Sequence, residues 1–185
     1  MNTPNKLTIA RMIATPIFMF FMLADFIPFR FTVALVLFAA ASITDYIDGN
    51  MARKQNIVTN FGKFLDPLAD KFLVLGALLA LLKKYSAELG DLLVWVTLVV
   101  ILRELAVTSL RLVAVNKSGK VIAASIWGKL KTVSQMVAII CVFLEPVIIT
   151  PYIHTPAYLL SYITLVFMMV TTIFSGVDYF VKFLK

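Results

Sequence analysis

Residues 45–70 read DYIDGNMARKQNIVTNFGKFLDPLAD, and four of them are aspartates: Asp45, Asp48, Asp66 and Asp70. Strongly apolar sequence flanks this stretch on both sides, which places the four carboxylates at or near membrane depth. A carboxylate costs roughly 2.5–3.5 kcal/mol near the centre of a spanning helix, and less near an interface. Bound cations give a physical reason for the cluster, because hard divalent ions take oxygen ligands and bridge carboxylates to substrate phosphates.

The composition is that of a membrane protein. Of 185 residues, 61% are hydrophobic and 15% are charged, and the mean hydropathy is +0.95. A spanning helix needs about 20 apolar residues, so the chain has room for about six spans. We expect an all-α, membrane-embedded protein with a single domain over residues 1–185. The stretch from Met12 to about Phe29 is long for a signal sequence, and we interpret it as the first span.

Apolar runs separated by polar or proline-containing segments predict six helices. The separating segments include a polar loop at Lys54–Asn60, a basic loop at Asn116–Lys120 and a loop with three prolines at Glu145–Pro156. The predicted helices cover about residues 5–26, 31–53, 61–82, 92–115, 123–144 and 157–180.

The distribution of lysine and arginine predicts the orientation, because cytoplasmic loops carry the excess of basic residues. A cytoplasmic amino terminus leaves only Arg30, Lys83 and Lys84 near the outer face. The formal charge of +7 then suits an anionic inner leaflet. Nucleic-acid binding is a poor interpretation, because the basic residues flank spans. The basic residues placed at the cytoplasmic face are Lys6, Arg11, Arg53, Lys54, Lys117, Lys120, Lys182 and Lys185.

Cys141 is the only cysteine and His154 the only histidine. The chain therefore has no internal disulfide, and neither a zinc site nor a Ser-His-Asp site is expected.

Helix geometry gathers the aspartates on two faces. At about 100° per residue, the second predicted helix places two aspartates and two small residues on one face, and the third places a glycine and two aspartates in a stripe. The loop between these helices is short, so they are expected to be antiparallel neighbours. Four converging carboxylates repel unless cations neutralise them, and two divalent ions fit the charge. The residues on the two faces are Asp45, Asp48, Gly49 and Ala52, and then Gly62, Asp66 and Asp70.

The pattern D-x-x-D-G-x-x-A-R, followed after eight residues by G-x-x-x-D-x-x-x-D, resembles the signature of the CDP-alcohol phosphotransferase family at every position. The surrounding sequence resembles the phosphatidylglycerophosphate synthase branch of that family, and the resemblance covers essentially the whole chain. The further segments that carry it are Asn5-x-x-Thr8-x-x-Arg11, Arg103-Glu104-Leu105, Arg111 and Gly128-Lys129-Leu130-Lys131-Thr132.

The resemblance implies a reaction in which a hydroxyl attacks the β-phosphorus of a CDP-linked lipid and CMP leaves. It implies two divalent cations, Mg²⁺ or Mn²⁺, held by Asp45, Asp48, Asp66 and Asp70, with Asp70 also acting as general base. It implies a homodimer. The lysine and arginine distribution places the site at the cytoplasmic face of the cell membrane. The residues expected to bind CDP-diacylglycerol are Asn5, Thr8, Arg11, Asp48, Gly49, Ala52, Arg53 and Gly62.

Basic residues beside such a site indicate an acceptor that carries a phosphate, and the branch implies sn-glycerol 3-phosphate. We expect Arg111, Lys129 and Lys131 to hold that phosphate. The two lysines point about 160° apart on a straight helix, so both reach one site only with bent stems or a distortion at Gly128. Glu104 could instead pair with a basic neighbour, which would make that neighbour structural.

Other interpretations of the same residues remain. The basic residues could be positive-inside anchors, and Asn5 and Thr8 could cap the first helix. The acceptor could be inositol phosphate or phosphatidylglycerol. From a different class, intramembrane aspartates also suit a small divalent-cation transporter, which would have no reason to bind soluble CDP.

Overall fold

The computed structural model describes the backbone of residues 3–55, 60–118, 126–149 and 158–184. Side chains are described for residues 9–44, 69, 71–111, 113–114, 126–147 and 158–184. Within these ranges the chain forms α-helices joined by turns, with one π-helical segment and no strand. The elements are α1 (Thr3–Leu23), α2 (Arg30–Gln55), α3 (Asn60–Lys84), α4 (Gly90–Ser118), α5 (Ile126–Leu144), the π-helical η1 (Glu145–Ile149) and α7 (Leu159–Leu184).

The described helices confirm the predicted six-helix membrane fold. Three stretches are long and apolar enough to cross a bilayer, namely Gly90–Arg111, Ile126–Val147 and Leu159–Leu184. Ile9–Leu23 and Arg30–Thr44 are shorter apolar helical stretches. Large apolar side chains cover much of the exposed surface, as expected of helices that face lipid tails.

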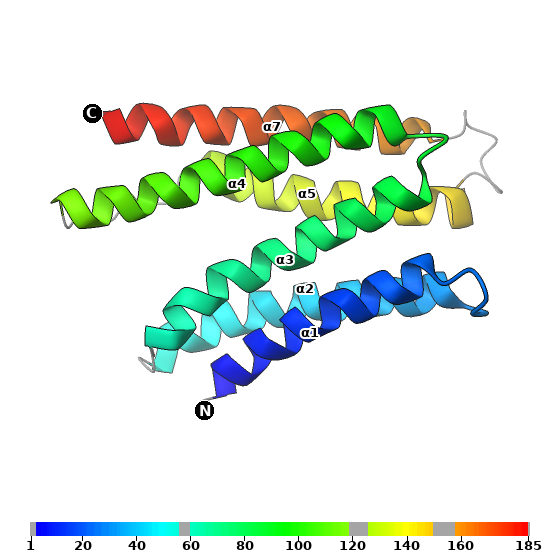
Figure 1. Ribbon diagram of the computed structural model, residues 1–185, viewed down its shortest axis with the longest axis horizontal. Coiled ribbons are helices and arrows are strands. Elements are labelled where there is room, and N and C mark those ends of the chain that lie inside the picture. Colours follow the sequence, from blue (N-terminus) through cyan, green and yellow to red (C-terminus); the bar gives the residue numbers. More distant parts are fainter. Residues whose placement is uncertain (1–2, 56–59, 119–125, 150–157, 185) are drawn as a thin grey trace. The chain divides into compact units, whose positions relative to one another are not determined.

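The helices form two compact units, residues 1–84 and 85–185. In the first unit, α1 packs along both α2 and α3, whereas α2 and α3 contact each other only slightly among the described residues (Figure 1). In the second unit, α7 packs against both α4 and α5 (Figure 1). The first helix is therefore the element that joins the two helices carrying the aspartates. The single domain expected from the sequence stays a prediction.

Close packing of α1 against α3 depends on a glycine. A Cβ atom on Gly76 would lie 2.5 Å from Cγ2 of Thr15 on α1, closer than carbon atoms approach. One turn after Thr15, α1 also packs on α2, where the rings of Phe18 and Phe38 lie 5.7 Å apart. Both phenylalanines are fully buried, so this unit has an apolar core of its own.

A charged cluster joins the α1–α2 turn to the end of α3. Lys84 Nζ donates a 2.6 Å hydrogen bond to Asp25 Oδ1, and Arg30 forms an ion pair with the same oxygen. The ammonium of Lys84 also lies 5.4 Å from the centroid of the Phe31 ring. The hydrogen bond from Lys84 is the main cause that lowers the pKa of Asp25 below its usual value.

In the second unit, Glu145 connects the end of α5 to the start of α7. Its fully buried carboxylate accepts hydrogen bonds from the backbone N–H groups of Leu160, at 2.9 Å, and Ser161, at 2.6 Å, and from the Ser161 hydroxyl. It thus satisfies N–H groups that the first turn of α7 leaves unpaired. The prediction of a loop from Glu145 onward was wrong for Glu145–Ile149, which is π-helical. Pro146, which has no N–H to donate, lies in this segment.

Candidate active site

The backbone supports the predicted acidic faces. Helix α2 runs without a break to Gln55, so Asp45 and Asp48 lie about one turn apart on the same helix. Helix α3 begins at Asn60, which places Asp66 and Asp70 in its first three turns. The side chains of these aspartates lie outside the described part of the structure. Among the described side chains, no three acidic, histidine or cysteine residues gather as metal ligands. The four-aspartate metal site therefore stays a prediction.

Arg11 is the described member of the set expected to bind CDP-diacylglycerol. It is 4% exposed, and Thr15, one turn later, donates a 3.1 Å hydrogen bond to its carbonyl oxygen. Arg11 thus lies on the same buried face of α1 as Thr15, which contacts α3 at Gly76. A buried guanidinium needs anionic or polar partners. The role of Arg11 in binding CDP-diacylglycerol stays a prediction. The other predicted members, whose side chains lie outside the described part, are Asn5, Thr8, Asp48, Gly49, Ala52, Arg53 and Gly62.

The three residues expected to bind the acceptor phosphate have different environments. Arg111 is exposed on α4, and its guanidinium carbon lies 6.0 Å from the centroid of the Tyr179 ring on α7. Lys129 is exposed on α5, whereas Lys131 is 8% exposed and points into the unit. The two lysines therefore face in different directions, as the helix geometry predicts. The structure brings Lys131 alone of these three into a buried polar network.

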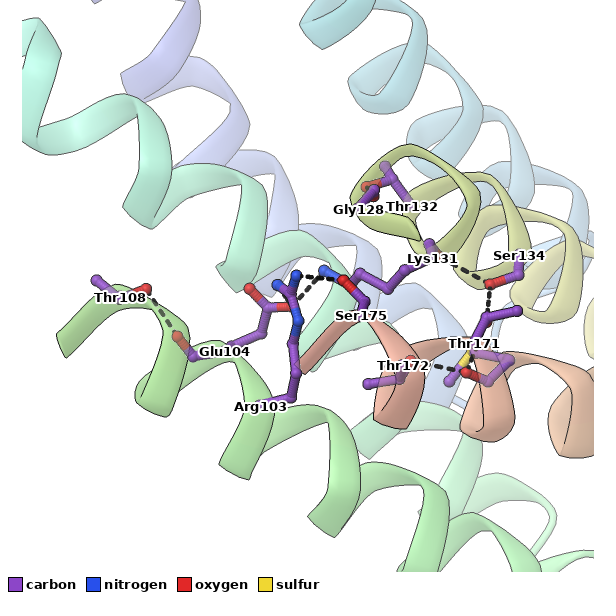
Figure 2. A network of polar contacts seen from close by, with 11 residues as sticks. Arg103, Glu104, Thr108, Gly128, Lys131, Thr132, Ser134, Thr171, Thr172 and Ser175 are labelled. Atoms are coloured by element: carbon purple, nitrogen blue, oxygen red, sulfur yellow. Dashed lines mark hydrogen bonds and ion pairs between the residues drawn. The ribbon is translucent and has the colours of Figure 1, made fainter. Parts of the chain in front are cut away.

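That network joins three helices around the carboxylate of Glu104 (Figure 2). Lys131 Nζ on α5 forms an ion pair with Glu104 Oε1 on α4. Arg103 Nη1 donates to the same oxygen at 3.2 Å, and its Nη2 donates to Ser175 Oγ on α7 at 2.7 Å. Gly176, beside Ser175, leaves room for the arginine, because a Cβ there would lie 3.3 Å from Arg103 Cγ.

Hydroxyl groups extend the network between α5 and α7. Ser134 and Thr171 are hydrogen-bonded at 2.7 Å, and Ser134 also donates to the carbonyl of Lys131 at 2.8 Å (Figure 2). Gln135, next to Ser134, is 2% exposed, and its Nε2 has no hydrogen-bond partner among the described atoms. Ser134, Gln135 and Thr171 were not among the residues predicted from the sequence. Polar residues recur at spacings of three or four on both helices, as in Lys131, Ser134 and Gln135 on α5 and in Thr171 and Ser175 on α7. This spacing forms a polar stripe on each otherwise apolar helix, and the stripe could have been recognised in the sequence.

These observations define an all-helical membrane protein with an acidic helix pair in one unit and a buried cationic network in the other. Comparison with known proteins makes the assignment specific. The chain belongs to the CDP-alcohol phosphatidyltransferase family, whose model matches residues 1–176. The family resemblance seen in the aspartate pattern is thereby confirmed.

Several relatives are similar over most of their length. A Bacillus subtilis protein named CDP-diacylglycerol–glycerol-3-phosphate 3-phosphatidyltransferase is 42% identical, over 98% of this chain and 94% of its own. A Mycobacterium tuberculosis protein named probable phosphatidylglycerophosphate synthase is 38% identical, over 100% of this chain and 82% of its own. A Salmonella paratyphi A protein with the same name as the Bacillus protein is 38% identical, over 82% of this chain and 81% of its own.

Proposed function

We propose that this protein transfers the phosphatidyl group of CDP-diacylglycerol to sn-glycerol 3-phosphate, giving phosphatidylglycerophosphate and CMP. The observation that carries the proposal is the near full-length similarity to proteins named for this reaction. The complete aspartate pattern supports the chemistry, and the cationic side chains of the second unit suit a phosphorylated acceptor.

The donor set fits divalent cations. Four carboxylates at helix-face spacing lie on two continuous helices, and carboxylate oxygen is the ligand that Mg²⁺ and Mn²⁺ prefer. Asp45, Asp48, Asp66 and Asp70 would hold two such ions, which when bound would neutralise charge on the pyrophosphate.

The chain's own residues then position the substrates and move one proton. The acceptor hydroxyl attacks the β-phosphorus of the CDP-lipid, the bond from that phosphorus to the bridging oxygen breaks, and CMP leaves with the oxygen. Asp70 accepts the proton of the attacking hydroxyl, a role that a carboxylate within hydrogen-bond reach performs. Arg11 and Arg53 supply positive charge at the CDP end, with Asn5 and Thr8 near it. Gly49, Ala52 and Gly62 are small enough for a ligand to approach the helices closely.

Arg111, Lys129 and Lys131 hold the acceptor phosphate in this proposal. Lys129 faces away from Lys131, so it reaches that phosphate only with its long side chain bent back. The protein works as a multi-pass protein of the cell membrane and as a homodimer, with its site facing the cytoplasm and membrane lipids around it. The excess of lysine and arginine on the segments assigned to the cytoplasm supports this orientation.

The proposal is tested with purified protein in lipid bilayers, CDP-diacylglycerol, Mg²⁺ and a panel of alcohols. We expect equimolar CMP and phosphatidylglycerophosphate with glycerol 3-phosphate, and loss of both in excess EDTA. Faster CMP release with inositol phosphate, phosphatidylglycerol or free glycerol would overturn the acceptor assignment. Absence of CMP release with every alcohol would overturn the reaction itself.

The orientation is tested separately by labelling. A cysteine placed at Asn56 in a Cys141→Ser background should resist an impermeant thiol reagent in intact cells and react after the cells are opened. Ready labelling in intact cells would place this loop outside.

A further inference from the structure

Two cations share one carboxylate oxygen inside the second unit. Arg103 and Lys131 both interact with Oε1 of Glu104. The side chains of all three are largely buried, at 13%, 9% and 10% exposed for Arg103, Lys131 and Glu104. Charged groups in such surroundings interact more strongly than in water, because little solvent screens them.

Glu104 is therefore the counterion that allows the two cations to lie side by side. Without its charge, a guanidinium and an ammonium held near the same point would repel each other, and each would lose a charge-assisted hydrogen bond. Lysine has a long, flexible stem with several accessible rotamers, so its ammonium has no fixed place unless an anion holds it. The contacts to Glu104 come from two helices and fix the spacing of the two positive groups.

Arg103 keeps one donor for an anion. Its Nε is buried without a hydrogen-bond partner among the described atoms. A phosphate dianion suits such a place, because it accepts hydrogen bonds from both cations.

We propose that Glu104 is a positioning residue for acceptor binding: its carboxylate holds Lys131 beside Arg103 so that the pair presents a fixed arrangement of donors to the acceptor phosphate. The inference rests on the proposed function. Glu104 does not touch the acceptor itself, so it acts on acceptor affinity through Lys131 and leaves the CDP-lipid end unaffected.

The test is steady-state kinetics of the full-length Glu104→Gln variant in lipid bilayers, with both substrates varied. The amide keeps the shape of the side chain and removes its charge. We expect the KM for glycerol 3-phosphate to rise about tenfold or more, as for loss of a charge-assisted contact, while the KM for CDP-diacylglycerol changes less than about twofold. Glu104→Asp, which keeps the charge, should recover part of the loss. Asp91→Asn removes a carboxylate from the exposed first turn of the same helix and should match the unsubstituted protein.

A double-substitution cycle shows whether Glu104 acts through Lys131. Once Lys131→Gln is present, adding Glu104→Gln should raise the KM for glycerol 3-phosphate by less than about twofold, because the group to be positioned is already gone. The double variant can be compared with Lys131→Gln even if Glu104→Gln alone does not fold. Two neutral amides then replace the ion pair, so no lysine is left buried without its carboxylate.

The outcomes separate this inference from the proposed function. An unchanged or lowered KM for glycerol 3-phosphate in Glu104→Gln overturns the inference, as does a full additional loss in the Lys131→Gln background. An equal rise in both KM values overturns it too, because that pattern indicates general damage to the fold. If the unsubstituted protein does not use glycerol 3-phosphate, the proposed function fails, whatever the variants show.

Discussion

The acidic helix pair of the first unit and the polar network of the second contrast in how they are encoded. The aspartates on α2 and α3 recur at spacings of three and four, so each helix gathers its own set. The network on α4, α5 and α7 joins residues far apart in the sequence, such as Glu104 and Lys131, which are 27 positions apart. A site built from the periodicity of single helices can be predicted from sequence, whereas one built from contacts between helices depends on their packing.

The two sites should respond differently to substitution, and the largest loss of activity is expected from substitutions in the acidic helix pair. Asp70→Asn should abolish turnover while part of the binding of CDP-diacylglycerol remains, because the amide keeps the shape but cannot accept the proton. Loss of a general base costs about 10²–10⁴-fold in rate, and more if metal binding is also lost. Single-turnover assays beside a binding assay measure both effects. A variant within a few-fold of the unsubstituted protein would remove Asp70 from the mechanism.

The basic residues should affect the other substrate. Alanine at Arg111, Lys129 or Lys131 should raise the KM for glycerol 3-phosphate by roughly tenfold to a hundredfold, the usual cost of one charge-assisted contact. The KM for CDP-diacylglycerol should change little, since these residues are expected to grip only the acceptor phosphate. Normal KM values for glycerol 3-phosphate in all three variants would show that the residues are membrane anchors.

A smaller effect is expected on the stability of the first unit. Gly76→Ala should lower the free energy of unfolding by about 1–3 kcal/mol, because the new methyl group meets Thr15 at 2.5 Å and forces α1 away from α3. Gly128→Ala is the matched control, since a Cβ there has no neighbour within 4 Å. Thermal unfolding in detergent should separate the two variants. Equal unfolding temperatures would contradict the close packing of α1 on α3.

The smallest effect concerns the charged cluster around Asp25. Its pKa is lowered in the folded protein, mainly by the hydrogen bond from Lys84. The pairing therefore stabilises the fold above the pKa of the unfolded chain, about 3.9, and this contribution is lost as the pH falls through the folded value. Asp25→Asn should flatten the acid side of a plot of unfolding temperature against pH. The difference should be small, because solvent screens this exposed carboxylate. An identical acid dependence in the variant would exclude the pairing.

The sequence predicted the helical membrane fold and most helix ends to within a few residues, because long apolar runs and polar loops determine both. It also predicted that Lys129 and Lys131 face apart. It did not predict the π-helical turn at Glu145, whose buried carboxylate accepts a hydrogen bond from Ser161 on α7, 16 positions later. It could not choose whether Glu104 pairs with Arg103, with Lys131 or with neither. That choice depends on how α4, α5 and α7 pack, which no local spacing determines.

We propose that the two helix sets divide the substrates between them. The acidic pair acts on the CDP-lipid through divalent cations, and the cationic network acts on the acceptor. The most direct test measures two quantities in two variants, Asp48→Asn and Lys131→Gln. We predict that Asp48→Asn raises the Mg²⁺ concentration needed for half-maximal activity without changing the KM for glycerol 3-phosphate, and that Lys131→Gln does the reverse. Equal changes in both quantities in both folded variants would contradict the division.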